Sequence, residues 1–171
     1  YNVNDLTANV TAKVGDKNEW RFFLNGFTEY SETPGGLSQA QWEQDPEQSV
    51  NPHDFFEARR FSTAISYKRS FDETNSLTTS VYGSYLKRDW WLDNRNATAS
   101  KRKFIAALRD IPTVGLFSDY ERTNTLFDKE NKLLAGIRLH TDITHEVSVA
   151  GDEMGKKAGK TTANSANTVA V

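Results

Sequence analysis

Long runs in which apolar and polar side chains alternate constrain this chain more than any other feature of its sequence. In residues 5–14, the aliphatic side chains occupy every second position and polar side chains occupy the positions between. A period of two is the repeat of a β-strand, whereas an α-helix repeats every 3.6 residues. Residues 19–30 continue the period of two, and residues 15–18 between the runs read Gly-Asp-Lys-Asn, which is typical of a tight turn. The pattern predicts a long β-hairpin.

Two further hairpins are predicted, each with two alternating runs around a short turn. Their runs and turns occupy residues 61–69, 72–75 and 77–87, and residues 133–139, 142–144 and 147–149. The last hairpin is the least regular of the three. All four prolines, Pro34, Pro46, Pro52 and Pro112, fall outside these runs, as expected for strands that have neighbours on both sides.

Long connections alternate with the short turns. Residues 31–58 and residues 89–132 are irregular, and residues 151–171 form a tail rich in Gly, Lys, Thr and Asn. Residues 114–120 could form a short strand, but we interpret them as part of an elaborated loop. Short turns at one end of the strands and long loops at the other are typical of outer-membrane β-barrels.

The length of the runs also favours a membrane β-barrel over a soluble sheet. About ten residues are needed for a tilted strand to cross a bilayer. Aromatic side chains lie near the predicted strand ends, where they suit the membrane interface: Trp20, Tyr30, Phe71, Tyr85, Trp90 and Trp91. A soluble antiparallel sheet alternates in the same way, so the loop asymmetry is what separates the two interpretations. No apolar run approaches the roughly 18 residues of a membrane-spanning helix, which excludes helical membrane proteins.

The number of strands limits what the chain can form alone. Six predicted strands, or seven with the doubtful one, are fewer than the eight of the smallest bacterial single-chain barrels. We therefore expect an all-β fold, an antiparallel transmembrane β-barrel segment with long extracellular loops. Residues 1–171 would belong to a single barrel domain that further strands complete.

Composition argues against several other functions. The chain has 21 Lys and Arg against 23 Asp and Glu, without the concentrated basic excess of a nucleic-acid-binding protein. It has no Cys and three His, and it lacks a nucleophile elbow. Residues 155–161 superficially resemble a phosphate-binding loop but are one residue too short for it. We expect neither an enzyme nor a bound cofactor.

The first long connection is predicted to contain a short helix. Ser38 is a candidate N-cap, and Gln41 stands three residues later as its capping-box partner. The helix should run from residue 38 to about residue 45, because the residue before Pro46 disfavours helical conformation.

The sequence around this helix resembles a known family. The segment TPGGLSQAQWEQDPEQS, followed by ARRFSTAISYKRSF, is similar to the first extracellular loops of TonB-dependent outer-membrane transporters, in particular the ferric dicitrate and siderophore branch. The resemblance covers residues 20–91, and the remainder matches only in its hairpin rhythm. It implies a 22-stranded barrel with an N-terminal plug in the outer membrane of a Gram-negative bacterium, importing a ferric chelate. We recognise no plug domain in this sequence, so the TonB complex would be contacted through parts of the protein absent from this chain.

An anionic chelate favours arginine at the barrel mouth, because its guanidinium group pairs with carboxylates through two hydrogen bonds. The candidate ligand-binding residues are Arg59, Arg60, Arg88, Arg95 and Trp42. For each arginine the alternative is a solvated charge on the rim. His53 stands beside Asp54, but the iron would arrive already chelated, so no metal site is expected.

Two other functions remain open from the sequence. A passive porin or surface barrel without TonB coupling would show the same alternation and aromatic strand ends. A soluble β-sandwich or ligand-binding barrel is the third alternative.

Overall fold

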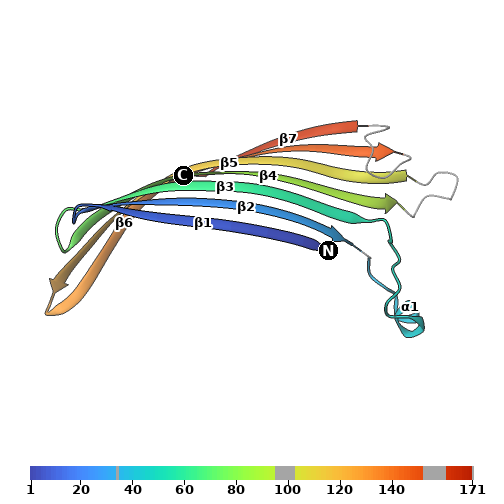
Figure 1. Cartoon of the computed structure of the whole chain (residues 1–171), viewed down its shortest axis with the longest axis horizontal. Helices are drawn as coiled ribbons and strands as arrows, with labels where there is room; N and C mark the ends of the chain where they lie inside the picture. Colours follow the sequence, from blue (N-terminus) through green and yellow to red (C-terminus); the bar gives the residue numbers. More distant parts are fainter. Residues whose placement is uncertain (34, 95–102, 152–160, 171) are drawn as a thin grey trace.

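The computed structural model describes residues 1–33, 35–94, 103–151 and 161–170. Seven strands form one antiparallel sheet in which each strand pairs with its neighbours in sequence, and one short helix lies in the first long connection (Figure 1). The elements are β1 (Asn2–Val14), β2 (Asn18–Glu32), α1 (Gln39–Gln44), β3 (Phe55–Ser70), β4 (Asn75–Asn94), β5 (Lys103–Leu126), β6 (Lys129–Gly151) and β7 (Thr161–Ala170). The sheet is a single curved layer, and the all-β prediction is confirmed. No helix in these described ranges is long and apolar enough to span a membrane.

The connections alternate in length as predicted. Short turns join β1 to β2, β3 to β4 and β5 to β6 at one end of the sheet, and the strand ends that lead into the longer connections lie at the other end (Figure 1). The turn between β3 and β4 is closed by Asp72, whose carboxylate accepts hydrogen bonds from the side-chain amide of Asn75 and from the backbone N–H groups of Thr74 and Asn75. These bonds, above all that from the Asn75 side chain, lower the pKa of Asp72 to about 2.

The predicted loop helix is present. α1 begins after Ser38, whose hydroxyl accepts a hydrogen bond from the Gln41 backbone, and the Gln41 side chain reaches back to the Ser38 backbone N–H at 2.9 Å. The two bonds form the capping box that the sequence predicted. The helix ends at Gln44, two residues before Pro46.

The second half of the chain differs from the prediction. Residues 89–132, expected to be a loop, contain the end of β4, all of β5 and the start of β6. The predicted turn at residues 142–144 lies inside β6, and the actual turn is formed by Phe127 and Asp128. The tail contributes β7. The expected count of six to seven strands is confirmed, but the prediction of the third hairpin was wrong.

Pro112 explains part of this difference. Contrary to the prediction that every proline lies outside the strands, Pro112 lies within β5 and pairs with Tyr85 of β4. On the β6 side, the ladder is interrupted between the pair Asp110 and His145 and the pair Thr113 and Asp142. A proline has no N–H to donate, and the ladder on the β6 side of Pro112 is open at this point. The register on the two sides of the interruption is the same, so the strand continues without a bulge.

Strand register separates the side chains into two faces. The apolar face carries the even-numbered residues of β1, β2 and β5 and the odd-numbered residues of β3, β4 and β6, and the polar face carries the others. One row across the apolar face consists of Val10, Phe22, Ile65, Val81, Leu116 and Leu139. One row across the polar face consists of Thr7, Asn25, Ser62, Ser84, Thr113 and Asp142.

The central rows of the apolar face are not covered by a second layer, whereas at the long-loop end of this face Trp91, Ala106, Leu108 and Val149 form a buried cluster. Val10 is 60% exposed, Val81 51% and Val114 55%, whereas a soluble sheet would bury such side chains. Towards the short turns, Trp20 and Tyr67 lie in contact on this face, with ring centroids 4.7 Å apart. Towards the long loops, the charged side chains of Arg59, Lys87 and Asp110 follow the aliphatic rows. An apolar belt beside an aromatic edge is typical of the outer surface of membrane β-barrels.

Candidate functional site

Arg59 and Arg60 are neighbours in sequence but lie on opposite faces of β3, because successive side chains of a strand alternate. Arg59 lies on the apolar face, where its guanidinium group forms an ion pair with Glu57. Arg60 lies on the polar face, opposite Phe27 of β2. Of these two sequence candidates, Arg60 alone shares the polar face with Arg88.

Arg60 is held against the wall of the polar face by two contacts. Its guanidinium carbon lies 5.3 Å from the centroid of the Phe27 ring, and one terminal nitrogen donates a hydrogen bond to Asn25 at 3.3 Å. Asn25 is itself buried and donates hydrogen bonds to Asp5 and Thr7. Stacking on an aromatic ring leaves the remaining N–H groups of a guanidinium free to bind an anion.

Two further arginines lie beside Arg60. Arg88 of β4 is paired in register with Ala58, two residues before Arg60, and directly with Arg109 of β5. Arg88 stacks on Phe56, with 5.9 Å between the guanidinium carbon and the ring centroid. We call Arg60, Arg88 and Arg109 the arginine cluster. All three stand near the strand ends that lead into long connections.

The arginine cluster has more positive charge than its ion pairs neutralise. Arg109 donates to Glu146 of β6 at 2.5 Å. Within the described residues, neither Arg60 nor Arg88 forms an ion pair with a carboxylate. Like charges directly opposite each other on neighbouring strands repel, so the Arg88–Arg109 pair favours a bound anion. The arrangement can bind a negatively charged ligand through bidentate hydrogen bonds.

Trp42 and Arg95 do not extend this cluster. Trp42 projects from α1 and is 58% exposed, beside a loop cavity of about 560 Å³ that Leu37 and Pro46 also line. Figure 1 shows α1 beyond the long-loop end of the strands, apart from the sheet. Arg95 lies outside the described residues.

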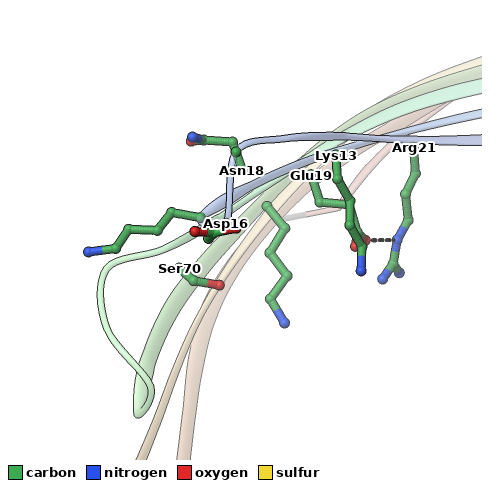
Figure 2. Close-up of a pocket in the computed structure, with 9 residues that line it drawn as sticks. Lys13, Asp16, Asn18, Glu19, Arg21 and Ser70 are labelled. Atoms are coloured by element: carbon green, nitrogen blue, oxygen red, sulfur yellow. Dashed lines mark hydrogen bonds and ion pairs between the residues drawn. The ribbon is translucent and has the colours of Figure 1, made fainter.

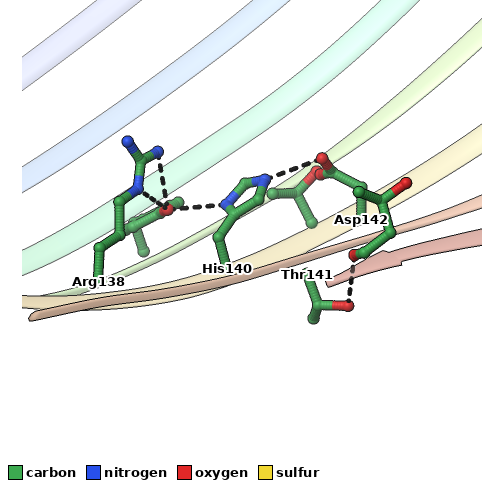
Figure 3. Close-up of polar contacts among 7 residues, drawn as sticks. Arg138, His140, Thr141 and Asp142 are labelled. Atoms are coloured by element: carbon green, nitrogen blue, oxygen red, sulfur yellow. Dashed lines mark hydrogen bonds and ion pairs between the residues drawn. The ribbon is translucent and has the colours of Figure 1, made fainter. Parts of the chain in front are cut away.

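A second cluster of polar side chains lies closer to the short turns. The Tyr82 hydroxyl lies 2.8 Å from His140 Nδ1, and His140 Nε2 lies 2.8 Å from a carboxylate oxygen of Asp142. Arg138 donates to the same hydroxyl at 3.2 Å. Figure 3 shows Arg138, His140 and Asp142 on one side of β6, with Thr141 pointing to the other.

Tyr82 reaches this group by crossing β5 at Gly115. A Cβ atom on Gly115 would lie 2.2 Å from the Tyr82 ring, so only glycine leaves space for it. Tyr82, His140 and Asp142 thus each form a side-chain hydrogen bond to another strand or to each other, and Arg138 donates from Nε and from one terminal nitrogen to the Tyr82 hydroxyl. We interpret these hydrogen bonds as a structural contact that links β4 to β6.

A cation-rich cavity of about 350 Å³ lies at the short-turn end of the polar face (Figure 2). Lys13, Arg21 and Lys68 line it together with Glu19, and Arg21 donates to Glu19 at 2.6 Å. Its acidic and basic groups alternate between adjacent strands, as expected of a solvated wall. Nowhere in the described ranges do three His, Cys, Asp or Glu side chains stand together so as to hold a metal ion.

Arg109 is the site residue that the sequence interpretation missed. It lies in the segment taken for a loop, so its face could not be assigned. For Arg59 and Arg60, by contrast, the sequence does indicate the face of the sheet. The period of two places Arg59 on the same face as Phe61 and Ile65, and Arg60 on the same face as Ser62 and Ala64.

The comparisons with known proteins bear on the fold. No family model matches the chain, and no curated protein matches its sequence. The crystal structure of the ferric citrate transporter FecA in the unliganded form is similar, with a TM-score of 0.87 and 17% sequence identity over 98% of this chain and 25% of that one. The chain thus spans about a quarter of the length of FecA. It therefore has the fold of a β-barrel segment of FecA, and the structural resemblance predicted from residues 20–91 is confirmed at the level of fold.

Proposed function

We propose that this chain is part of the barrel of a TonB-dependent outer-membrane receptor that binds and imports a ferric chelate, such as ferric citrate or a siderophore. In this proposal residues 1–171 belong to one barrel domain, the apolar face contacts outer-membrane lipid, and the polar face lines the lumen. The plug and the segment that contacts the TonB complex would lie elsewhere in the protein. The chain would act by binding and not by catalysis.

The observation that carries this proposal is the arginine cluster on the polar face, near the long loops. Ferric citrate and many other ferric chelates are anionic, and guanidinium groups bind carboxylate oxygens in bidentate geometry. Two of the three arginines, Arg60 and Arg88, have no carboxylate partner in the described ranges and are held by aromatic rings. The likeness to a ferric citrate transporter supports the same ligand class.

The adjacent residues Arg59 and Arg60 provide a matched test. In the intact protein in detergent, we expect Arg60→Gln to weaken ferric citrate binding about tenfold or more, since a hydrogen bond to a charged group contributes about 1.5–3 kcal/mol. Arg59→Gln removes the same charge one residue away but on the face towards lipid, and it should change the affinity less than about twofold. Isothermal titration calorimetry measures both.

Three results would contradict the proposal. Equal losses in the two variants would indicate a general effect of net charge. No change in Arg60→Gln, or in Arg88→Gln tested in parallel, would remove the arginine cluster as the ligand site. Failure of the unaltered protein to bind any ferric chelate saturably would favour the passive porin.

A further inference from the structure

A cavity of about 490 Å³ adjoins the arginine cluster on the polar face, towards the long loops. Its floor consists of small side chains contributed by β5 and β6, namely Ala107, Ser148 and Ala150. Trp90, Leu92 and Ile105 form its sides. Arg109 also lines the cavity, so one member of the arginine cluster belongs to both.

The sides of this cavity are apolar, although it lies on the polar face. Trp90 is 42% exposed and Ile105 is 38% exposed, although both project from the face that carries Ser, Thr and Asn in the rows below. Trp90 pairs in register with Phe56 on one side and with Ala107 on the other, and Ala107 pairs with Ser148, so the small side chains of β5 and β6 leave open space beside the Trp90 ring. Exposed apolar surface of this kind, rimmed by polar groups, marks ligand-binding grooves.

The charge beside the cavity identifies the kind of ligand that fits it. Arg109 lies at its edge, and Arg88, the direct cross-strand partner of Arg109, carries a second positive charge. A purely apolar ligand would leave the Arg88 guanidinium group without an anionic partner, and a small fully polar ligand would leave the Trp90 side unfilled.

We infer that this cavity binds an aromatic ring of an anionic chelate, with the ring against Trp90 and the negative charge at Arg109 and Arg88. The inference rests on the proposed function and narrows it to chelates that surround their metal with aromatic donors. The arginine cluster then selects for charge, and the Trp90 cavity selects among anions of similar charge.

Two ferric complexes of equal charge test the inference. A hexadentate tris-catecholamide and tris-oxalate both give octahedral trianions with six oxygen donors around iron, but only the catecholamide carries aromatic rings. We expect the intact protein in detergent to bind the ferric tris-catecholamide more tightly than ferric tris-oxalate. Trp90→Ser should weaken catecholamide binding about tenfold, the upper range for an aromatic contact, and should change oxalate binding less than twofold.

Two further variants distinguish a loss of the aromatic contact from a loss of folding. Trp90→Phe retains an aromatic ring and should keep most of the catecholamide affinity. Ala107→Leu narrows the cavity beside Trp90 and should weaken binding of the catecholamide selectively. Circular dichroism and heat-modifiable gel migration confirm that each variant is folded.

The outcomes separate this inference from the proposed function. Loss of both complexes in Arg60→Gln, together with equal or unchanged affinities in Trp90→Ser, would overturn the aromatic cavity and leave the anion site standing. Failure of the unaltered protein to bind either complex would overturn both. Selective loss of the catecholamide complex in Trp90→Ser and Ala107→Leu, with recovery in Trp90→Phe, is the result that we expect.

Discussion

Phe127 and Asp128 show how one turn depends on individual backbone angles. Both residues have positive φ, 53° and 59°, as required at the centre of a two-residue type I′ hairpin turn. This turn normally contains Asn-Gly or Asp-Gly, because other side chains are strained there. Phe127 is also 89% exposed, so its ring makes little compensating contact. The hairpin of β5 and β6 therefore closes through an unfavourable residue.

Replacing Phe127 by asparagine should relieve this strain. We expect Phe127→Asn to raise the free energy of unfolding of the intact protein by about 1 kcal/mol, since asparagine tolerates the left-handed region. Urea unfolding in lipid vesicles measures the change. Phe127→Leu removes the exposed ring but keeps the backbone penalty, and it should give no gain. An equal gain from both variants would assign the effect to the ring and not to the backbone.

At the scale of the strand, the decisive property is which face each residue occupies. Val10 and Thr11 are adjacent in β1, but Val10 belongs to a row of aliphatic and aromatic side chains and Thr11 pairs with Arg21. In water, a valine that is 60% exposed could be replaced by a charged residue with little effect. In a bilayer the same replacement places the charge within the hydrocarbon layer, one row of pairs from the aromatic edge formed by Trp20 and Tyr67.

Arginine substitutions at these two positions distinguish the two environments. We expect Val10→Arg to lower the free energy of unfolding of the intact protein in lipid vesicles by about 2 kcal/mol, because the cost of an arginine falls from the bilayer midplane towards the interface. Thr11→Arg, on the polar face, should lower it by about 1 kcal/mol or less. Similar small effects in both variants, together with folding in the absence of detergent, would indicate that the apolar face is not in contact with lipid.

At the scale of the whole molecule, the sheet has a direction, with short turns at one end and the strand ends that lead into long connections at the other (Figure 1). The strands β4, β5 and β6 have 20, 24 and 23 residues, about twice the length that a tilted strand needs to cross a bilayer. If the apolar belt lies in the outer membrane, β4 extends the wall towards the long loops, and β5 and β6 extend it beyond both edges of the belt. The long-loop end, with the arginine cluster, would face the outside of the cell.

Single cysteines can report this orientation, because the chain contains no Cys of its own. We expect a membrane-impermeant maleimide to label Gln44→Cys, on the loop helix, in intact cells. Asp16→Cys, in the turn between β1 and β2, should react only after the outer membrane is permeabilised. Labelling of Asp16→Cys in intact cells, or protection of Gln44→Cys there, would contradict the proposed orientation.

Local signals predicted much of the first half of the fold. The alternation in residues 5–14 predicted β1, and the pairing of Ser38 with Gln41 predicted the capping box of α1. Both depend on residues close in sequence. Pro112 misled the same reasoning, because a proline is tolerated within a strand when its neighbour leaves the ladder open at that point. The opening opposite Pro112 lies between His145 and Asp142, where a turn had been expected.

The candidate site was predictable only in part, for a related reason. The period of two is a property of the chain itself, so the sequence alone determined that Arg59 and Arg60 project to opposite faces. It also determined the two faces of the first four strands, the loop helix and the alternation of short and long connections. Only the tertiary structure decided that Arg88 stands opposite Arg109, and that Trp90 faces Ala107 across an open cavity. Those pairs depend on the register between β4 and β5, which is set by hydrogen bonds between residues far apart in the chain and is not encoded in the alternation of either strand.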